Sequence, residues 1–542
     1  MRPTRLRSGP GTGHADIVAA SPLPRPTVVA RPLREAGHVV PGLGDTPDVL
    51  ITGISLDSRT IRPGDLYAAL PGANHHGASF VRQAAQNGAA VVLTDPVGAQ
   101  LIGQDYDLSA VPQVIVADPR SLLGALSAWT YGYPAREMAV VGITGTDGKT
   151  TTAMLLEAAL QAAGHRTGLI GTVVTRIADE EIPAARTTPE ATDLHALLAV
   201  MRERGVTAVA MEVSSHALAL GRVDAVDFDV AVFTNLGHDH LDFHADQESY
   251  FQAKASLFTP ARSRRGLVCV DDQWGRRLLS EAQIPVQSYS VAEAGQDDLA
   301  YGVPADWQGC GLLGSGVGFR YQLQGPAGLS VTGATALAGV FNVRNSVAAA
   351  AAAITLGSDP QTAVDGIEYA RAVPGRMEPI VEGQPFVVLV DYAHTPDAVS
   401  RALSVGQELA VRNGGRLIAL LGCGGDRDKA KRPLMGAVAA RLADVVVVTD
   451  DNPRSERPEQ IREQIMAGAV AQVQLADADR SWVELLDRPE RQRALQEVVQ
   501  MAHSGDVVMA LGKGHERGQE IGGTVYPLDD REILRSAIRS ST

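Results

Sequence analysis

The sequence predicts an α/β protein of three domains with largely parallel sheets, and three observations carry this prediction. The chain has 542 residues, which is too long for a single hydrophobic core. Short, uninterrupted apolar runs alternate with helical stretches, as expected for strands that are covered on both faces. The 55 glycines and the aromatic content of only 4% favour repeated strand–turn–helix units over a β-sandwich.

Residues 1–45 predict a flexible N-terminal extension, because they are rich in Pro and Arg and lack the apolar stretch of a secretory signal. The pattern of residues 46–137 predicts a small N-terminal α/β domain. Its apolar runs at 49–54, 90–93 and 114–117 alternate with turns and with a helical stretch at 77–87.

Residues 138–372 predict the central domain. A β-branched run at 138–144 enters a glycine-rich turn, and the helical pattern of residues 150–163 follows directly. Further candidates for buried strands lie at 208–213, 230–233 and 267–270. The order of strand, glycine-rich turn and helix predicts a P-loop ATPase-like domain with a parallel-rich sheet.

Residues 373–542 predict a Rossmann-like C-terminal domain that repeats strand, loop and helix. The strand candidates are residues 386–390, 417–421, 445–448 and 507–511. Each of them ends in a loop that is dense in Asp, Gly, His or Arg. Ligands of open α/β sheets bind outside the carboxyl ends of the strands, so these loops are the expected wall of a site.

Charge and cysteine usage narrow the possible partners. The net charge of −14 argues against a nucleic-acid-binding surface, although a local pocket can still be positive. Cys269, Cys310 and Cys423 form no CxxC pair, which fits a reducing compartment and predicts a cytoplasmic protein. No apolar run reaches the roughly 18 residues needed to cross a bilayer, so no membrane partner is expected.

The strongest local signal is the turn that follows the first central strand. Its residues are Gly145, Thr146, Asp147, Gly148, Lys149, Thr150 and Thr151. Glycines let successive N–H groups point at phosphate oxygens, and the following helix N-terminus adds positive potential. Lys149 would reach the β- and γ-phosphates of ATP, and Thr150 would bind Mg²⁺. A strict P-loop would carry Gly at Ile143, so a glycine-rich turn without a ligand is the alternative.

This loop and five later motifs resemble those of the Mur ligases, whose relatives include the folylpolyglutamate synthetases. The later motifs are MEVSSH, GHDHLD, FNVRN, PGRME and DYAHTPD, in the order of the family. They contain Glu212, His240, Asn342, Asn345, Arg376 and Asp391. The resemblance implies an ATP-dependent ligase of peptidoglycan synthesis, which phosphorylates a carboxylate and then joins it to an amine.

The resemblance also implies the catalytic residues, which are Lys149, Glu212, His240, Lys254 and Arg376. The implied Mg²⁺ ligands are Thr150, Glu212, His240 and Lys254. Lys254 is carbamylated to N6-carboxylysine in the family, which turns a cation beside the metal into an anion. An ordinary exposed helix lysine is the alternative. That alternative is weakened because the chain has only five lysines among its 48 Lys and Arg residues.

ATP is expected to lie between the central and C-terminal domains, so that catalysis requires domain closure. Asn342 and Asn345 are three residues apart at the start of a helix and can face one ligand. The resemblance assigns them to the adenine end, Arg376 to phosphate and Asp391 to the ribose.

The resemblance also implies contacts for the second substrate, UDP-N-acetylmuramoyl-L-alanyl-D-glutamate, with residues of the N-terminal and central domains. Leu220 stands where some family members carry Gln, and residues 73–75 occupy a second uridine-contacting loop. The implied contacts are Leu56, Ser58, Thr187, Thr188, Ser214 and Arg222.

The C-terminal loops resemble those of the family members that add meso-2,6-diaminopimelate. The carboxylate at the distal end of this amino acid suits a bidentate guanidinium, and its distal ammonium suits carboxylate or carbonyl oxygens. The implied contacts are Arg427, Asp451, Asn452, Pro453, Arg454, Gly512 and Glu516.

Two other functions stay open at this point. A ligase that adds lysine is one, and Arg454 discriminates against it, because lysine-adding members lack the Arg of the DNPR motif. A nucleotide-binding regulator without turnover is the other. The intact set of Lys149, Glu212, His240 and Lys254 argues against such a regulator, which need not keep these side chains.

Overall fold

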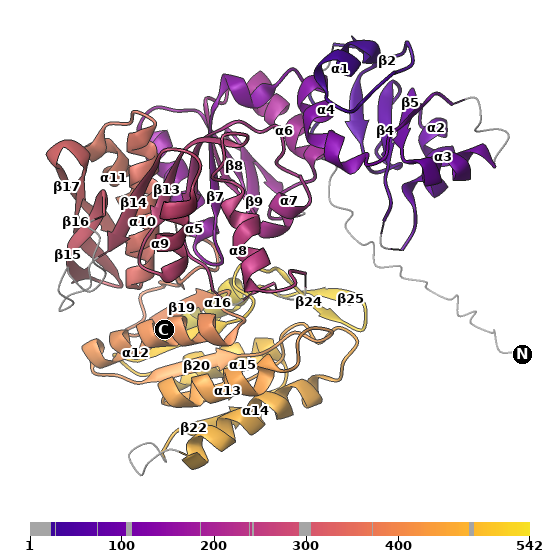
Figure 1. The fold of residues 1–542 in the computed structure, drawn as a ribbon. Coiled ribbons are helices and arrows are strands. Elements are labelled where there is room, and N and C mark those ends of the chain that lie inside the picture. The colour runs from indigo at the N-terminus through magenta and orange to yellow at the C-terminus, as the bar shows by residue number, and fades with distance from the viewer. Residues whose placement is uncertain are drawn as a thin grey trace, which may run out of the picture.

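The computed structural model describes residues 23–27, 29–72, 74–104, 111–184, 186–237, 239–240, 243–291, 305–370, 372–475 and 482–541. Figure 1 shows three α/β domains, with the chain running from the upper right through the centre to the lower half of the view. The main sheet of each domain is mostly or wholly parallel. The predicted fold, with a small N-terminal domain, a parallel-rich central sheet and a Rossmann-like C-terminal domain, is confirmed.

The N-terminal domain contains a four-stranded parallel sheet in the order β3–β4–β5–β6. Alternate residues of β4 enter two different cores, Leu66 and Ala68 on one face and Tyr67 and Ala69 on the other. Both faces are therefore covered, which explains the uninterrupted apolar runs. The elements are β3 (Gly53–Ser55), β4 (Asp65–Ala69), β5 (Val91–Thr94), β6 (Gln113–Ile115), α2 (Val81–Gln86), α3 (Pro96–Gly103) and α4 (Leu123–Thr130).

This domain begins earlier than the sequence predicted. β1 (Arg31–Pro32) pairs antiparallel with β2 (Leu50–Ile51), and α1 (Leu33–Val39) buries Leu33 and Ala36 in the domain core. The prediction of a flexible extension up to residue 45 is therefore wrong for residues 31–43. The strand pairing that orders them is non-local, so local composition does not reveal it. Residues 1–22 of the predicted extension lie outside the described residues.

The central domain is organised by a sheet in which eleven described strands follow the order β10–β9–β8–β11–β7–β12–β13–β14–β15–β16–β17. The strands from β8 to β15 in this order are parallel, and antiparallel strands complete both ends. They are β7 (Ala139–Thr144), β8 (Thr167–Ile170), β9 (Val174–Ile177), β10 (Glu180–Pro183), β11 (Ala208–Glu212), β12 (Phe228–Phe233), β13 (Ser263–Cys269), β14 (Val286–Val291), β15 (Trp307–Ser315), β16 (Gly318–Gly325) and β17 (Leu329–Thr335).

Two helices on one face of this sheet bring distant residues to the phosphate loop. α10 (Val340–Thr355) packs against α5 (Lys149–Ala162), and its alanines at 348–353 are fully buried. Alanine allows the two helices to approach closely, and Asn345 of α10 accepts a hydrogen bond from the Thr152 hydroxyl of α5 at 3.3 Å. The other helices of the domain are α6 (Ala191–Glu203), α7 (Ser215–Ala219), α8 (Gln247–Ala255), α9 (Gln273–Glu281) and α11 (Pro360–Glu368).

The C-terminal domain has a sheet in the order β18–β19–β23–β20–β21–β22, parallel except for β18. Separate cores cover its two faces. The strands are β18 (Glu378–Pro379), β19 (Val387–Asp391), β20 (Leu417–Leu421), β21 (Val445–Val448), β22 (Glu484–Asp487) and β23 (Val507–Leu511). The helices are α12 (Pro396–Asn413), α13 (Lys431–Leu442), α14 (Pro458–Leu475), α15 (Arg491–Met501) and α16 (Asp530–Ser541), and a hairpin of β24 (Gly518–Ile521) and β25 (Thr524–Pro527) precedes α16.

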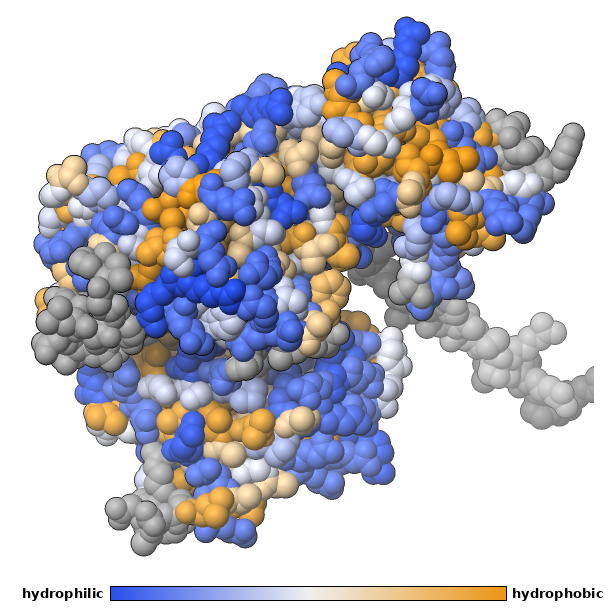
Figure 2. All heavy atoms as spheres, viewed as in Figure 1, coloured by the Kyte–Doolittle hydropathy of each residue, from blue (hydrophilic) through white to orange (hydrophobic). Residues whose placement is uncertain are grey.

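The surface differs between the domains. Figure 2 shows mainly hydrophilic residues on the right-hand side of the C-terminal domain, whereas apolar residues gather on the visible face of the N-terminal domain. Within the part of the chain that the structure describes, no helix is both long and apolar enough to cross a membrane.

Candidate active site

The phosphate loop joins β7 to α5, and two of its glycines are required by close neighbours. Gly145 and Gly148 have φ angles of 151° and 84°, where other residues are strained. A Cβ atom on Gly145 would lie 1.8 Å from the Thr234 hydroxyl, and one on Gly148 would lie 2.4 Å from Oδ1 of Asn345. The loop therefore packs directly against the end of β12 and Asn345 of α10.

Lys149 is the first residue of α5, and its side chain closes the phosphate loop. Its Nζ donates to the carbonyl oxygens of Gly145 at 2.9 Å and Thr146 at 2.8 Å. Burial lowers the pKa of Lys149, and the nearby guanidinium of Arg376 lowers it further, while Glu212 and other carboxylates act in the opposite direction. A cation held among backbone N–H groups at a helix N-terminus is suited to bind phosphate.

Lys254 lies on α8 and is buried, with 1% of its surface exposed, so the alternative of an ordinary exposed lysine is wrong. Its Nζ donates to the carbonyl oxygen of Gly145 at 2.7 Å and lies 4.5 Å from the centre of the Tyr250 ring. Burial, together with the ammonium of Lys149, holds the pKa of Lys254 well below its ordinary value. A neutral lysine amine is the form that reacts as a nucleophile.

Glu212 ends β11 and is only 1% exposed. Its Oε2 accepts hydrogen bonds from the hydroxyls of Thr150 and Thr172, both at 3.0 Å, and its Oε1 accepts one from the Thr172 backbone N–H at 2.7 Å. The structure thus joins Thr150 and Glu212, both predicted Mg²⁺ ligands. Thr172 was not predicted from the sequence as part of the site, although its position two residues after β8, where site loops begin, could have suggested it.

His240 follows β12 and has a φ angle of 57°. Its side chain is 41% exposed, and its ring lies edge-on to the ring of His216, with 4.8 Å between the ring centres. Its backbone N–H donates to the Asp239 carboxylate at 2.8 Å. The neighbouring His238 and Asp242 lie outside the described residues.

The donor chemistry near the loop fits Mg²⁺, since a hydroxyl and a buried carboxylate are oxygen ligands. Among the described residues, no three His, Cys, Asp or Glu side chains are arranged to hold a metal ion. Mg²⁺ commonly uses one or two carboxylates together with water and substrate phosphates, so it does not need such a group. The ligand roles of His240 and Lys254 stay predictions.

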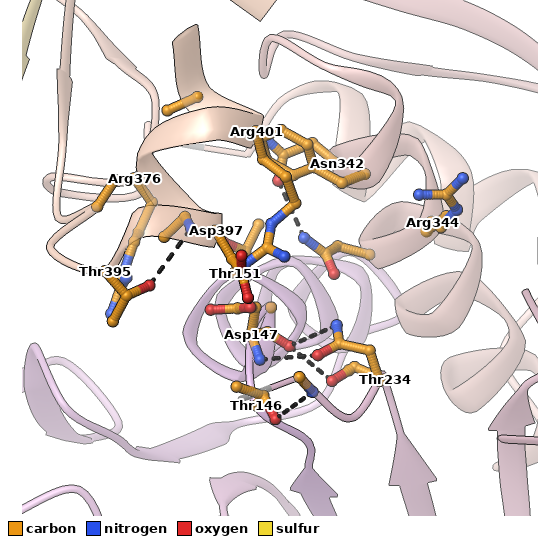
Figure 3. Close-up of a pocket in the computed structure, with 18 of the residues that line it drawn as sticks. Thr146, Asp147, Thr151, Thr234, Asn342, Arg344, Arg376, Thr395, Asp397 and Arg401 are labelled. Carbon is orange, nitrogen blue, oxygen red and sulfur yellow. Dashed lines mark hydrogen bonds and ion pairs between the residues drawn. The ribbon is translucent and has the colours of Figure 1, made fainter. Parts of the chain in front are cut away.

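A cavity of about 390 Å³ lies between the central and C-terminal domains, beside the phosphate loop. Figure 3 shows the loop residues Thr146, Asp147 and Thr151 opposite residues of the C-terminal domain, Arg376, Thr395 and Arg401. An ion pair between Arg401 and Asp147 crosses the cavity from one domain to the other. The sequence did not reveal Arg401, whose role depends on this contact between domains.

The cavity wall contains all four residues predicted to bind ATP outside the loop, namely Asn342, Asn345, Arg376 and Asp391. The Arg376 guanidinium lies 4.8 Å from the centre of the Tyr392 ring, and its buried Nε has no hydrogen-bond partner among the described residues. Asp391 accepts the backbone N–H groups of Met377 at 2.7 Å and Ala393 at 2.8 Å. Burial nevertheless raises its pKa, which the neighbouring Arg376 partly offsets.

The residues predicted to contact the muramyl dipeptide form one chain of contacts near Glu212. The hydroxyl oxygens of Thr187 and Thr172 lie within hydrogen-bond distance, 3.0 Å apart. The Thr188 hydroxyl donates to the Glu212 carbonyl at 2.9 Å and accepts the Ser214 N–H at 3.1 Å. Arg222 is paired with Glu190 at 2.8 Å, which the sequence did not indicate.

The predicted uridine contacts lie in the N-terminal domain, after β3. The Ser58 hydroxyl donates to Gln83 at 2.7 Å, and Leu56 is partly buried against the domain core. Ala73, in the second predicted uridine loop, lies outside the described residues.

The residues predicted to bind the amino acid come from loops after β20, β21 and β23, which meet at one edge of the C-terminal sheet. Arg454 has a φ angle of 52°, and it donates through Nη1 to the Gly425 carbonyl at 2.7 Å and through Nε to Glu520 at 3.2 Å. Asp451 and Asn452 are buried, while Arg427 is exposed. Pro453 lies between them and Arg454, and its carbonyl would lie 2.0 Å from a Cβ atom on Gly425.

The loop after β23 completes this group. A Cβ atom on Gly512 would lie 2.7 Å from the Asp451 carboxylate, and Glu516 accepts from the Asn452 amide at 2.8 Å. Lys513 and Glu520 were not predicted as part of the site. Tyr392 links this loop to the ATP cavity, since its ring lies 5.3 Å from the ring of His515 and also contacts Arg376.

Comparison with known proteins matches all three domains to one family. The Mur ligase catalytic domain matches residues 50–130, the Mur ligase middle domain residues 143–353, and the Mur ligase glutamate ligase domain residues 375–514. A UDP-N-acetylmuramoyl-L-alanyl-D-glutamate–2,6-diaminopimelate ligase of Streptomyces coelicolor is 51% identical, over 96% of this chain and 98% of the relative. The chain belongs to the Mur ligase family.

Other Mur ligases agree with this assignment. A 2,6-diaminopimelate ligase of Corynebacterium glutamicum is 44% identical over 90% of this chain and 92% of its own. A solved structure of a UDP-N-acetylmuramoyl-L-alanyl-D-glutamate–2,6-diaminopimelate ligase has a TM-score of 0.65 at 30% identity, covering 95% of this chain and 99% of that one. A Thermotoga maritima MurF ligase in complex with ADP, with a TM-score of 0.57 and 17% identity, covers 90% of this chain and 96% of its own and shows likeness of fold.

Proposed function

We infer that the protein is an ATP-dependent ligase that adds meso-2,6-diaminopimelate to UDP-N-acetylmuramoyl-L-alanyl-D-glutamate in peptidoglycan synthesis. The observation that carries this inference is the cavity beside the phosphate loop, because its wall joins loop residues to Arg376 and Asp391 of the next domain. Relatives that cover nearly the whole chain carry the same activity in their names. ATP is the co-substrate.

The reaction begins with transfer of the γ-phosphoryl group of ATP to the side-chain carboxylate of D-glutamate, which releases ADP and forms an acyl phosphate. Lys149 and the loop N–H groups hold the β- and γ-phosphates, and Arg376 approaches from the C-terminal domain. Arg376 is suited to this role because its buried Nε has no hydrogen-bond partner within the part of the chain that the structure describes. An unpaired buried guanidinium nitrogen favours an incoming oxyanion.

The diaminopimelate amine then attacks the acyl carbonyl, forming a tetrahedral intermediate. Its collapse breaks the bond to the phosphate oxygen, releases inorganic phosphate and leaves the new amide bond. Positioning and charge neutralisation provide most of the rate enhancement in such a reaction. Because Tyr392 contacts both Arg376 and His515, the loop that carries Glu516 is held beside the phosphate site.

We propose that Thr150 and Glu212 hold Mg²⁺ with His240 and a carbamate on Lys254. The ion, when bound, neutralises charge on the phosphate oxygens. The buried Thr150 hydroxyl and Glu212 carboxylate support this proposal, since they lie 3.0 Å apart at the phosphate loop. The lowered pKa and burial of Lys254 support its carbamylation, because the neutral amine is the form that adds CO₂.

Adenine is proposed to contact Asn342 and Asn345, and the ribose Asp391, all on the cavity wall. The dipeptide is proposed to contact Thr187, Thr188, Ser214 and Arg222, and the uridine Leu56 and Ser58. The distal end of diaminopimelate is proposed to contact Arg427, Arg454, Asp451, Asn452, Pro453, Gly512 and Glu516. We also propose a cytoplasmic location, because the described cysteines are free thiols and the reaction consumes ATP.

Phosphate release tests this function. The purified protein is given ATP, Mg²⁺ and the UDP-linked dipeptide, with either meso-diaminopimelate or L-lysine. Phosphate release that depends on diaminopimelate is expected. Release with lysine alone would identify a lysine-adding ligase, and the absence of release with any amino acid would favour a nucleotide-binding regulator.

A further inference from the structure

Lys513 is a fully buried cation in the loop after β23, and its side chain is 0% exposed. Its Nζ has three acceptors: Oδ1 of Asn452 at 3.1 Å, Oε2 of Glu516 at 2.8 Å and the Gly518 carbonyl at 2.6 Å. Three acceptors match the three N–H donors of an ammonium group. The side chain therefore has no donor left for a ligand.

The contacts of Lys513 fix the orientation of the Asn452 amide. Its Oδ1 accepts from Lys513 and from the Glu520 backbone N–H at 3.0 Å, so its NH₂ group must point the other way. That NH₂ group donates to Oε2 of Glu516 at 2.8 Å. Lys513 thus determines where both polar side chains lie.

The same ammonium links the three parts of the amino-acid site. Asn452 comes from the loop after β21, Glu516 from the loop after β23, and Gly518 begins the β24–β25 hairpin. This hairpin carries Glu520, which holds Arg454. Loss of the ammonium would leave the partly buried Glu516 carboxylate and the carbonyl oxygens of Asn452 and Gly518 with one donor fewer each.

We propose that Lys513 is a positioning residue of the amino-acid site, which orders Asn452 and Glu516 for the distal end of diaminopimelate. This inference rests on the proposed function of these loops. A lysine is required because its compact ammonium meets three acceptors from different directions, whereas a planar guanidinium is larger and directs its donors into one plane. The site is thereby preorganised before substrate binds.

Steady-state kinetics of Lys513→Met and Lys513→Arg test the proposal, with Arg493→Met as control for an exposed cation of the same domain. Both Lys513 variants should raise the KM for diaminopimelate about tenfold or more, as expected when buried polar groups lose a partner. The KM values for ATP and the UDP-linked dipeptide, and all values of the control, should change less than about twofold. If Lys513→Met does not fold, Lys513→Gln keeps two donors and serves the same comparison.

A double-mutant cycle separates positioning from general stability. If Lys513 acts through Glu516, the pair Lys513→Met and Glu516→Gln should raise the KM for diaminopimelate no more than the larger single change. Multiplying effects, or a normal KM in Lys513→Arg, would overturn the proposal. Arg454→Ala separates failure of the Lys513 proposal from failure of the proposed amino-acid site. If Arg454→Ala raises the KM for diaminopimelate and the Lys513 variants do not, only the role of Lys513 fails. If none of them raises it, the amino acid binds elsewhere.

Discussion

Lys149 and Lys254 both donate to the carbonyl oxygen of Gly145, at 2.9 Å and 2.7 Å. Two lysine side chains from different helices therefore meet at one acceptor inside the phosphate loop. Their proximity is one reason why the pKa of Lys254 is lowered, after burial. A carbamate on Lys254 would place an anion beside Lys149, so that opposite charges attract.

The first prediction is that Lys254→Ala is nearly inactive and that acetate partly restores its activity. Removal of the side chain deletes the proposed anion but leaves a space beside the loop, which a small carboxylate can enter. Phosphate release at increasing acetate concentrations measures the rescue.

Lys429→Ala is the control, because Lys429 is an exposed lysine of the C-terminal domain. It should keep normal activity and show no response to acetate. Full activity of unmodified Lys254 in bicarbonate-free buffer, with no adduct in ¹³C-bicarbonate NMR, would contradict the carbamate proposal.

The second prediction concerns Gly148, whose φ angle is 84°. In Gly148→Ala, the new Cβ atom would lie 2.4 Å from Oδ1 of Asn345, so that side chain must move. Because Asn345 is proposed to bind adenine, the KM for ATP should rise about tenfold or more. The KM for diaminopimelate should change little.

Gly164→Ala is a matched control for this change. Gly164 has a similar φ angle of 87°, but nothing lies within 4 Å of its added Cβ atom. Both variants should lose about 1 kcal/mol of stability from the left-handed backbone, and only Gly148→Ala should weaken ATP binding. An equal effect of both variants on the KM for ATP would show that contact with Asn345 is not the cause.

The third prediction is a pH dependence of stability that comes from His195. This side chain of α6 is fully buried, and burial lowers its pKa to about 4. Well above pH 6.5 the ring is neutral in both the folded and the unfolded chain, so it does not lower the stability of the fold. Between pH 6.5 and 4 mainly the unfolded chain gains the proton, and stability should fall by about 1.4 kcal/mol per pH unit near the middle of this range.

His195→Gln should remove this contribution, since glutamine has no proton to gain and its amide can still donate to the Asp224 carbonyl, as His195 does at 3.0 Å. Denaturant unfolding at pH 7.0 and pH 5.0 measures the difference between wild type and variant. The exposed His38→Gln serves as the control. A wild-type pH dependence that matches His195→Gln would rule out the assigned role.

The phosphate loop could be predicted from the sequence because its strand, turn and helix are consecutive. Contacts between distant residues could not. Thr172 lies 40 residues from Glu212 along the chain, and Glu520 lies 66 residues from Arg454. Their roles depend on which strands become neighbours in the sheet, and on the position of the β24–β25 hairpin, which local composition does not encode.

The N-terminal extension illustrates the same limit. Its Pro and Arg content suggested little structure, yet Leu33 is buried because β1 pairs with a strand that follows it by almost twenty residues. Lys254 shows the opposite case. The scarcity of lysine drew attention to this residue, and the structure shows that it is buried next to Lys149, while its chemical role stays a prediction.

The last prediction concerns the choice between diaminopimelate and lysine, which rests on Arg454. This guanidinium contacts Glu520 and the Gly425 carbonyl. The distal carboxylate of diaminopimelate would give it a second anionic partner, whereas lysine would bring only an ammonium near a cation. The wild type should therefore use diaminopimelate and reject lysine by about 10⁴-fold in kcat/KM, as sites built around a polar contact can.

Arg454→Ala should raise the KM for diaminopimelate steeply and leave the KM values for ATP and the UDP-linked dipeptide nearly unchanged. Activity with lysine should stay low or rise slightly, because the repulsion is gone while no new contact is made. Arg457→Ala is the control, since Arg457 is a 75% exposed arginine three residues away. Comparable wild-type kcat/KM values for both amino acids would refute the role of Arg454 in specificity, while the ligase reaction itself would stand.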